Sequence, residues 1–383
     1  MSKFIPYGHQ QISDSDIEAV VKVLRSDWLT QGPQVPTFEK ILAKKVGANH
    51  AVAVNSATSA LHLACLALGL SSGDSLWTVP NTFVASANCG RYCGAEVDFV
   101  DINPKTWNIN VDHLQEKLEI ASKKGSLPKI VVPVHFSGQP TEQERIWSLG
   151  QKYGFKVVED ASHSIGAKRN GEPVGSCRWS DITVFSFHPV KIITTGEGGM
   201  ALTNDQKLNN RMKRLREHGI NRDPKLMKNP PDGPWYYEQL DLGYNYRMSD
   251  IQAALGLSQL NHLEDFVSIR NKLAQLYDKQ FLKLPLQLQV IPKNNYSSRH
   301  LYVIRTESKN HLRVFKGLKK KGIGVNLHYR PVHLQPYYLQ LGFEIGNFPE
   351  AEAYGREAIS LPLFPSMSQE QQFRVISSIK ELI

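Results

Sequence analysis

The sequence predicts an α/β fold built on a mostly parallel sheet, and two observations support this prediction. Between about residues 50 and 205, short runs rich in Val and Ile alternate with longer segments. Several runs lack regular polar alternation, which is typical of strands buried on both faces. The longer intervals include amphipathic helical patterns, and strand–helix–strand alternation favours parallel pairing. Seven strands are predicted, at residues 51–54, 76–79, 97–100, 130–134, 155–158, 182–187 and 200–202.

The elements around these strands are predicted from their end signals. The segment from Thr58 to Leu68 has helical spacing and is followed by Gly69, a residue type that often ends helices. The proline-rich residues 225–234 are expected to form a loop. Ser249 and the Gln three positions later match a capping box, so a long helix is predicted to lead out of the large domain from there.

A smaller α+β region is predicted after residue 283. Leu301 to Arg305 and Ile323 to Leu327 read as strands, and Ser368 is expected to cap a terminal helix. We therefore predict a large α/β domain at residues 1–250, including an N-terminal arm, and a smaller α+β domain at residues 251–383.

Charge and composition narrow the class of protein. The 383 residues include 45 Lys and Arg against 36 Asp and Glu, a net charge of +9, which favours anionic partners. No apolar stretch reaches the roughly 18 residues of a membrane span, and the first residues lack a secretory apolar segment. The four cysteines are too few for a disulfide framework. We expect a cytoplasmic protein with neither a membrane partner nor a metal site.

The basic run from Lys207 to Lys228 is open to two interpretations. Nucleic-acid binding is one, but no aromatic stacking pattern accompanies the run. A solvated helix face or an entrance for an anionic substrate is favoured, so no nucleic-acid partner is expected. Cys89 and Cys93 are interpreted as packed thiols, because no second ligand pair lies nearby.

Lys191 is the first candidate for chemistry. It follows an apolar strand and precedes a glycine-rich turn, and no acidic residue lies within the five positions before it. A desolvated lysine has a lowered pKa and becomes a nucleophile for Schiff-base formation. The alternative is an ordinary solvated lysine beside a tight turn.

Two further elements accompany this lysine. Asp160 ends a predicted buried strand, at the edge where open α/β sheets bind ligands. It is either a helix cap or a counter-ion for a cationic heterocycle, which would make that ring an electron sink. Thr58 and Ser59 follow another strand at a helix start, where N–H groups and hydroxyls either cradle a phosphate or only cap the helix.

The combination resembles the pyridoxal-phosphate enzymes of fold type I, and more narrowly the DegT/StrS-type sugar aminotransferases. The resemblance covers nearly the whole chain. Its motifs lie at residues 28–33, 81–85, 159–161, 186–199, 243–248 and 328–331. It implies a mostly parallel seven-stranded sheet domain, a smaller α+β C-terminal domain and pyridoxal 5′-phosphate as the cofactor.

The resemblance implies roles for matching residues. Lys191 would form the Schiff base and move protons, Asp160 would pair with the pyridinium nitrogen, and His163 would lie near the phenolic oxygen. Phe83 would stack on the ring. The phosphate would be held by Thr58, Ser59, Ser186 and, from the partner subunit of a homodimer with a shared active site, Asn245.

Residues 81–88, 135–139 and 186–191 resemble most closely the branch of this family that serves pseudaminic acid biosynthesis. That branch implies amination of UDP-2-acetamido-2,6-dideoxy-hexos-4-ulose to UDP-4-amino-4,6-dideoxy-N-acetyl-β-L-altrosamine, with L-glutamate as the donor. The expected substrate-binding residues are Thr30, Gln31, His328, Tyr329 and Arg330.

Other functions remain in view. Another nucleotide-linked 4-keto or 3-keto sugar would suit the same site, and so would sugar dehydration, although dehydratases of this family carry His at the position of Lys191. A nicotinamide-dependent oxidoreductase would need a G-x-G-x-x-G turn after a strand, and the sequence has none. A binding protein without catalysis would have lost Lys191 or Asp160.

Overall fold

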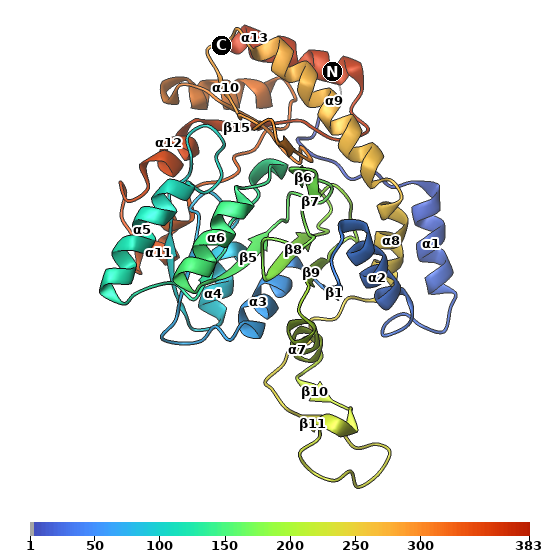
Figure 1. The fold of residues 1–383 in the computed structure, drawn as a ribbon. Coiled ribbons are helices and arrows are strands. Elements are labelled where there is room, and N and C mark those ends of the chain that lie inside the picture. Colours follow the sequence, from blue (N-terminus) through green and yellow to red (C-terminus); the bar gives the residue numbers. More distant parts are fainter. Residues whose placement is uncertain (1–3) are drawn as a thin grey trace.

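The computed structural model describes residues 4–383 and is built on a central seven-stranded sheet (Figure 1). The spatial order is β1-β9-β8-β5-β4-β2-β3, and β9 alone runs antiparallel to its neighbours. The prediction of seven strands in a mostly parallel sheet is therefore confirmed. The strands are β1 (His50–Val54), β2 (Ser75–Thr78), β3 (Glu96–Phe99), β4 (Ile130–Val131), β5 (Lys156–Asp160), β8 (Ile182–Ser186) and β9 (Gly199–Thr203).

Strand β4 is shorter than the predicted 130–134 run. Pro133 has no N–H to give to a ladder, so regular pairing stops before it. The chain nevertheless stays beside β5, because the Asp160 N–H donates to the Pro133 carbonyl at 2.9 Å.

Helices cover both faces of the sheet, and the strands supply alternate residues to each layer. Val52 and Val54 of β1 pack on one side, whereas Ala51 and Ala53 pack on the other. The first side is covered by α3 (Ala57–Ala67), α4 (Ala85–Tyr92) and α7 (Gln206–Arg216). The second side is covered by α2 (Gln34–Val46), α5 (Val111–Lys124), α6 (Gln143–Tyr153) and α8 (Asp250–Leu260).

The C-terminal part has its own core beneath a three-stranded antiparallel sheet. Ile5 of the N-terminal segment packs into this core, whose other buried residues all come from the C-terminal part of the chain. The sheet consists of β12 (Gln287–Leu288), β14 (Tyr302–Arg305) and β15 (Ala358–Leu361). Its helices are α9 (Leu263–Phe281), α10 (Ser308–Lys320) and α13 (Gln369–Leu382), with α11 (Pro336–Leu339) and α12 (Pro349–Glu357) nearby in sequence.

The remaining elements are small. Helix α1 (Asp14–Leu24) packs against α8, which in turn packs against α2. A second small sheet joins β6 (Lys168–Arg169), β7 (Glu172–Pro173) and β13 (Asn295–Tyr296). The hairpin of β10 (Ile220–Asn221) and β11 (Glu238–Gln239) projects from the body, on the side opposite α9, α10 and α13 (Figure 1).

Several local predictions are confirmed and two are wrong. The capping boxes at Ser249 and Ser368 are both present. The single long helix after residue 249 is wrong, because the chain breaks at residues 261–262 between α8 and α9. The strand at residues 323–327 is also wrong. Ile323 and Asn326 make only single bridges, to different partners on different sides, so no ladder forms.

The division at residue 250 stays a prediction, because α8 packs on the large sheet and α9 extends toward the C-terminal core.

None of the helices in residues 4–383 combines the length and the apolar character needed to cross a bilayer. Those residues also contain no group of three or more His, Cys, Asp or Glu side chains arranged to hold a metal ion.

Candidate active site

A cavity of about 380 Å³ lies beyond the carboxyl ends of β5 and β8. Segments distant in sequence build its wall, from the N-terminal segment to the loop at residues 326–329. Eight of the residues predicted from the sequence line it: Thr58, Phe83, Asp160, His163, Ser186, Lys191, His328 and Tyr329.

Lys191 lies in the turn after β8 and faces this cavity. Its backbone N–H donates to the His188 carbonyl at 2.9 Å, which fixes the turn. Burial lowers the pKa of the Lys191 amine to about 8, although the charge of Asp160 opposes that shift. At pH 7 about a tenth of the amine is therefore neutral and able to act as a nucleophile, far more than for an ordinary lysine.

Asp160 is the last residue of β5, and its carboxylate is held from two sides. Oδ2 accepts from the Ser86 hydroxyl at 2.5 Å, and Oδ1 accepts from the Ser162 N–H at 3.1 Å. The side chain is 5% exposed. A buried, oriented carboxylate of this kind favours a cationic partner in the cavity.

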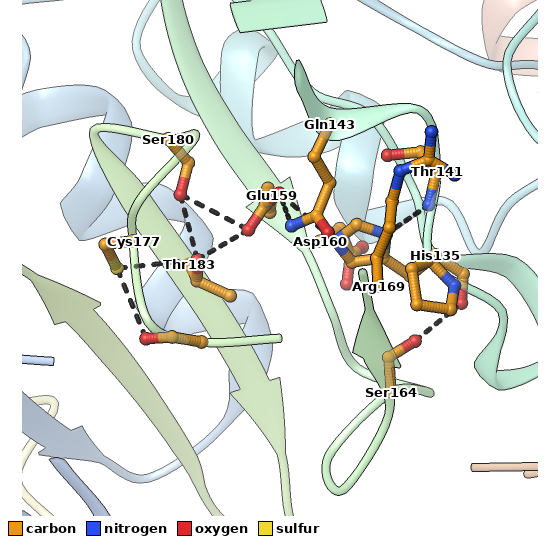
Figure 2. A network of polar contacts seen from close by, with 12 residues as sticks. His135, Thr141, Gln143, Glu159, Asp160, Ser164, Arg169, Cys177, Ser180 and Thr183 are labelled. Carbon is orange, nitrogen blue, oxygen red and sulfur yellow. Dashed lines mark hydrogen bonds and ion pairs between the residues drawn. The ribbon is translucent and has the colours of Figure 1, made fainter. Parts of the chain in front are cut away.

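Glu159 precedes Asp160 on β5 and therefore points to the opposite face of the sheet. Figure 2 shows its carboxylate within a buried polar network. It accepts from Gln143 Nε2 at 2.5 Å and from Thr183 Oγ1 at 2.7 Å, and His135 Nε2 lies 3.4 Å away. Burial raises the pKa of Glu159, but the His135 charge and these donors outweigh it, so the net shift is downward.

The Glu159 network also reaches Asp160 through the backbone. The His135 N–H donates to the Asp160 carbonyl at 3.1 Å, while His135 Nδ1 accepts from the Thr141 N–H at 3.0 Å. The side chain on one face of β5 thus fixes the strand from which Asp160 projects on the other face.

His163 has a defined hydrogen-bonding arrangement. Its Nδ1 accepts from the Ser137 N–H at 3.3 Å, and its Nε2 lies 3.3 Å from the Tyr329 hydroxyl. Burial first, and then the charges of Lys191 and His328, hold the pKa of His163 well below its usual range. The ring is therefore neutral with its proton on Nε2, which leaves that N–H as the donor toward the cavity side.

The start of α3 forms a cradle of backbone N–H groups. Ser56 caps the helix by accepting from the Ser59 N–H at 3.1 Å, and the Ser59 hydroxyl donates to Asn55 Oδ1 at 2.6 Å. Ser59 is thus engaged in the cap and does not line the cavity, whereas Thr58 does. A side chain at Gly199 on β9 would place its Cβ 2.5 Å from the Ala57 nitrogen, so glycine is required for this approach.

The loop at residues 326–329 closes the opposite wall. Asn326 Nδ2 donates to His328 Nε2 at 3.3 Å, so the His328 proton lies on Nδ1, which is 2.8 Å from the Ser360 hydroxyl. Burial and the Lys191 charge lower the pKa of His328 to about 3. Burial raises the pKa of Tyr329. Both side chains are therefore uncharged in the cavity wall.

Four other predicted residues lie outside the cavity in this chain. Thr30 forms a single bridge to Ser249, and Gln31 follows it in an exposed turn. Asn245 is exposed near the start of α3, where its carbonyl accepts from Asn55. Arg330 is exposed and donates to the Leu334 carbonyl at 3.4 Å. Their assigned roles stay predictions.

The cavity also includes residues that sequence reasoning missed, namely Tyr7, His188, Glu197, His300 and Asn326. Tyr7, His300 and Asn326 lie outside the motifs recognised in the sequence, so no local pattern pointed to them. His188 and Glu197 flank Lys191 within the recognised motif and could have been included on that ground.

Comparisons with known proteins assign this site to a family. Residues 10–380 match the family model for the DegT/DnrJ/EryC1/StrS aminotransferase family. The chain belongs to this family. The spore coat polysaccharide biosynthesis protein SpsC of Bacillus subtilis is 38% identical, with 99% of this chain and 97% of that protein covered. The UDP-4-amino-4,6-dideoxy-N-acetyl-beta-L-altrosamine transaminase of Campylobacter jejuni is 36% identical, with 98% and 99% covered.

A solved structure agrees with this assignment. PseC of Helicobacter pylori, an aminotransferase involved in the biosynthesis of pseudoaminic acid, superposes with a TM-score of 0.90. The identity is 31%, and 99% of each chain is covered. The fold type and the aminotransferase class expected from the sequence are thereby confirmed.

DegT/DnrJ/EryC1/StrS aminotransferases depend on pyridoxal 5′-phosphate, and the cavity suits this cofactor. A lysine with a lowered pKa, a buried carboxylate and a helix N-terminus with free N–H groups meet in one cavity. These groups match an aldehyde, a pyridine nitrogen and a phosphate, respectively. When bound, the cofactor supplies an electron sink for the carbon that exchanges its proton.

Proposed function

We propose that this sugar aminotransferase converts UDP-2-acetamido-2,6-dideoxy-hexos-4-ulose to UDP-4-amino-4,6-dideoxy-N-acetyl-β-L-altrosamine, with L-glutamate as the amino donor. The observation that carries the aminotransferase reaction is the Lys191 amine facing Asp160 and His163 in one cavity. Support for the sugar comes from the Campylobacter jejuni and Helicobacter pylori relatives. The product belongs to pseudaminic acid biosynthesis.

The side chains of the cavity divide the chemistry among them. Lys191 would hold the cofactor through its aldehyde and would then be the group that moves a proton to and from the reacting carbon. The Asp160 carboxylate would keep a proton on the pyridine nitrogen by its charge. His163, whose Nε2 lies 3.3 Å from the Tyr329 hydroxyl, would be the donor nearest the phenolic oxygen, and Phe83, which is 57% exposed here, would cover the ring. Thr58 and Ser186 would hold the phosphate directly. Ser59, predicted for the same role, is engaged in the α3 cap and would act by ordering that helix start.

We also propose that the active unit is a homodimer. The hairpin around β10 and β11 projects from the body and carries large exposed apolar side chains, including Trp235 at 74% and Leu242 at 78% exposure. A second copy would cover them. Asn245, at the base of this hairpin, would then serve the partner's phosphate site. Thr30, Gln31 and Arg330 would meet the nucleotide sugar together with His328 and Tyr329.

Absorbance and product analysis test the proposal. Purified protein given pyridoxal phosphate should develop a visible absorption band that glutamate abolishes, and Lys191→Ala should lack the band. Mass spectrometry should then find the 4-amino sugar when the UDP-4-keto sugar is added with glutamate. Absence of any band in the wild-type protein would overturn the cofactor assignment and the function together.

A second candidate is amination of another nucleotide-linked 4-keto or 3-keto sugar. SpsC, which is named for spore coat polysaccharide biosynthesis, is slightly more similar to this chain than the altrosamine transaminase. Parallel assays with a panel of keto sugars distinguish the two by kcat/KM. A dehydrated product without amination would instead indicate the dehydratase branch, which Lys191 disfavours.

A further inference from the structure

His300 lies in the cavity wall and has no role in the function proposed above. It comes from the loop between β13 and β14, more than 100 residues from Lys191 in sequence. Its side chain is 5% exposed, and its ring centroid lies 4.4 Å from that of His163. His300 is therefore a buried imidazole beside the group expected to meet the cofactor.

Among the buried histidines of residues 4–383, His300 differs in its hydrogen bonding. The five others each have at least one ring nitrogen within hydrogen-bond distance of a protein group: His62, His135, His163, His328 and His333. Neither ring nitrogen of His300 has such a protein partner in the described part of the chain, and its Nδ1 is fully buried. Buried polar groups are normally paired. Because Nδ1 is enclosed by protein, a molecule bound in the cavity that His300 lines can pair with the ring only at Nε2.

The loop that carries His300 is fixed in place. Ser298 Oγ donates to the His163 carbonyl at 2.9 Å, and Ser137 Oγ donates to the Leu301 carbonyl at 2.8 Å. The buried Arg270 donates to the His300 carbonyl at 3.2 Å. The backbone is therefore held from both sides, and the ring is buried beside His163 instead of facing solvent.

The state of the ring follows from its surroundings. Burial first, and then the nearby His163 and Lys191, hold the pKa of His300 well below its usual range, so the ring is neutral. A proton on Nδ1 would be a buried donor without an acceptor. The proton therefore lies on Nε2, and the ring offers one N–H to the cavity that it lines.

We propose that His300 is a ligand-binding residue whose Nε2–H donates to an anionic oxygen of the molecule bound in the cavity. Two sources of that oxygen fit, the phenolate of the cofactor and the carboxylate of the amino donor. A neutral donor suits an anionic oxygen in a site where Lys191 already supplies the positive charge. This inference rests on the proposed function and adds a binding residue to it.

The test compares His300→Phe with His300→Asn. The Phe variant keeps a flat ring against His163 but removes the donor, whereas Asn is smaller and retains an N–H. His333→Phe is the matched control, since His333 is buried without lining the cavity, and Glu352, beside it, keeps its bond to the Gly346 N–H. Circular dichroism and thermal melting establish that each variant is folded.

Two measurements separate the two sources of the oxygen. Titration of the apoprotein with pyridoxal phosphate gives the cofactor Kd, and the glutamate half-reaction gives KM and kcat separately. We expect His300→Phe to raise one of these constants, Kd or KM, by about tenfold or more, because a hydrogen bond to a charged group is lost. His300→Asn should recover part of the loss, and His333→Phe should match the wild-type protein.

Wild-type values of both constants in folded His300→Phe would overturn the inference while leaving the aminotransferase function intact. If His300→Phe does not fold, His300→Leu, which also lacks a donor, takes its place, and wild-type values of both constants in that folded variant again overturn the inference. Failure of the wild-type protein to bind pyridoxal phosphate is a different result, which would reject the proposed function itself.

Discussion

Two adjacent carboxylates at the end of β5 have opposite surroundings. Asp160 faces the cavity, and within residues 4–383 its carboxylate accepts from two donors, the Ser86 hydroxyl and the Ser162 N–H. Glu159 faces the other side, where Gln143, Thr183, Ser180 and His135 surround it (Figure 2). A carboxylate whose oxygens are all hydrogen-bonded stabilises the fold. A carboxylate beside a cavity that can still accept hydrogen bonds is available to a ligand. The number of hydrogen-bond partners therefore distinguishes the ligand-binding carboxylate from the structural one, although the two residues are neighbours in the sequence.

The largest expected effect is on the cavity side. Asp160→Asn removes the charge that would keep the pyridine nitrogen protonated, worth about 4 kcal/mol at about 4 Å and an effective dielectric of about 20. We expect kcat/KM for transamination to fall by about 10³-fold, with little change in the free energy of unfolding. Steady-state kinetics and urea denaturation measure the two quantities. A large loss of stability with a modest loss of rate would reverse the roles assigned to the two carboxylates.

The matched change on the other face is Glu159→Gln. It leaves His135 beside a neutral group and weakens the bonds from Gln143 and Thr183, so unfolding should become easier by about 2–3 kcal/mol. Urea denaturation at pH 7 checks this value. Because the pKa of Glu159 is lowered in the folded protein from an ordinary 4.5, its stabilisation is present above that pH and disappears as the pH falls through the lowered pKa. A difference between wild type and variant that persists at the lowest pH would contradict this explanation.

A smaller effect is expected at Ser86. Ser86→Ala removes the 2.5 Å hydrogen bond to Asp160 Oδ2 but keeps the carboxylate. The loss of one hydrogen bond is worth about 1.4 kcal/mol, so kcat/KM should fall by about tenfold. Ser180→Ala, which removes a donor from Glu159 instead, is the matched control and should leave kcat/KM near its wild-type value. Equal effects of the two changes on the rate would erase the distinction between the faces.

The smallest expected effect is a shift in the pH dependence of the rate at which the apoprotein takes up its cofactor. Lys191 attacks as the neutral amine, and its pKa is about 8, so the rate at which the apoprotein acquires its visible band should rise with pH through about 8 and level off above it. Asp160 raises the pKa of Lys191, so Asp160→Asn should move this midpoint to lower pH. Glu159→Gln should leave the midpoint in place. Stopped-flow absorbance over a pH series measures all three, and a midpoint that moved only in the Glu159 variant would be decisive against the assignment.

Local patterns determined much of what the sequence predicts correctly. The seven strands, the helix after β1 and both predicted capping boxes depend on residues within a few positions of one another. Asp160 was recognisable because it ends a buried strand, and Lys191 because it follows another one; such strand ends share one edge of a parallel sheet. Pairing that depends on distant partners was harder, as the failed strand at residues 323–327 illustrates.

The tertiary structure alone decided which polar side chains share the cavity and which do not. Ser59 is directed into a helix cap, and Arg330 is directed to solvent, although both follow recognised motifs. His300 and Asn326 enter the site because the C-terminal core packs their loops against the ends of β5 and β8. By itself, the sequence determined the fold and predicted the lysine and the carboxylate that face each other in the cavity. The completed wall, including the imidazole of His300, depends on packing between segments far apart in the chain, which no local pattern of residues encodes.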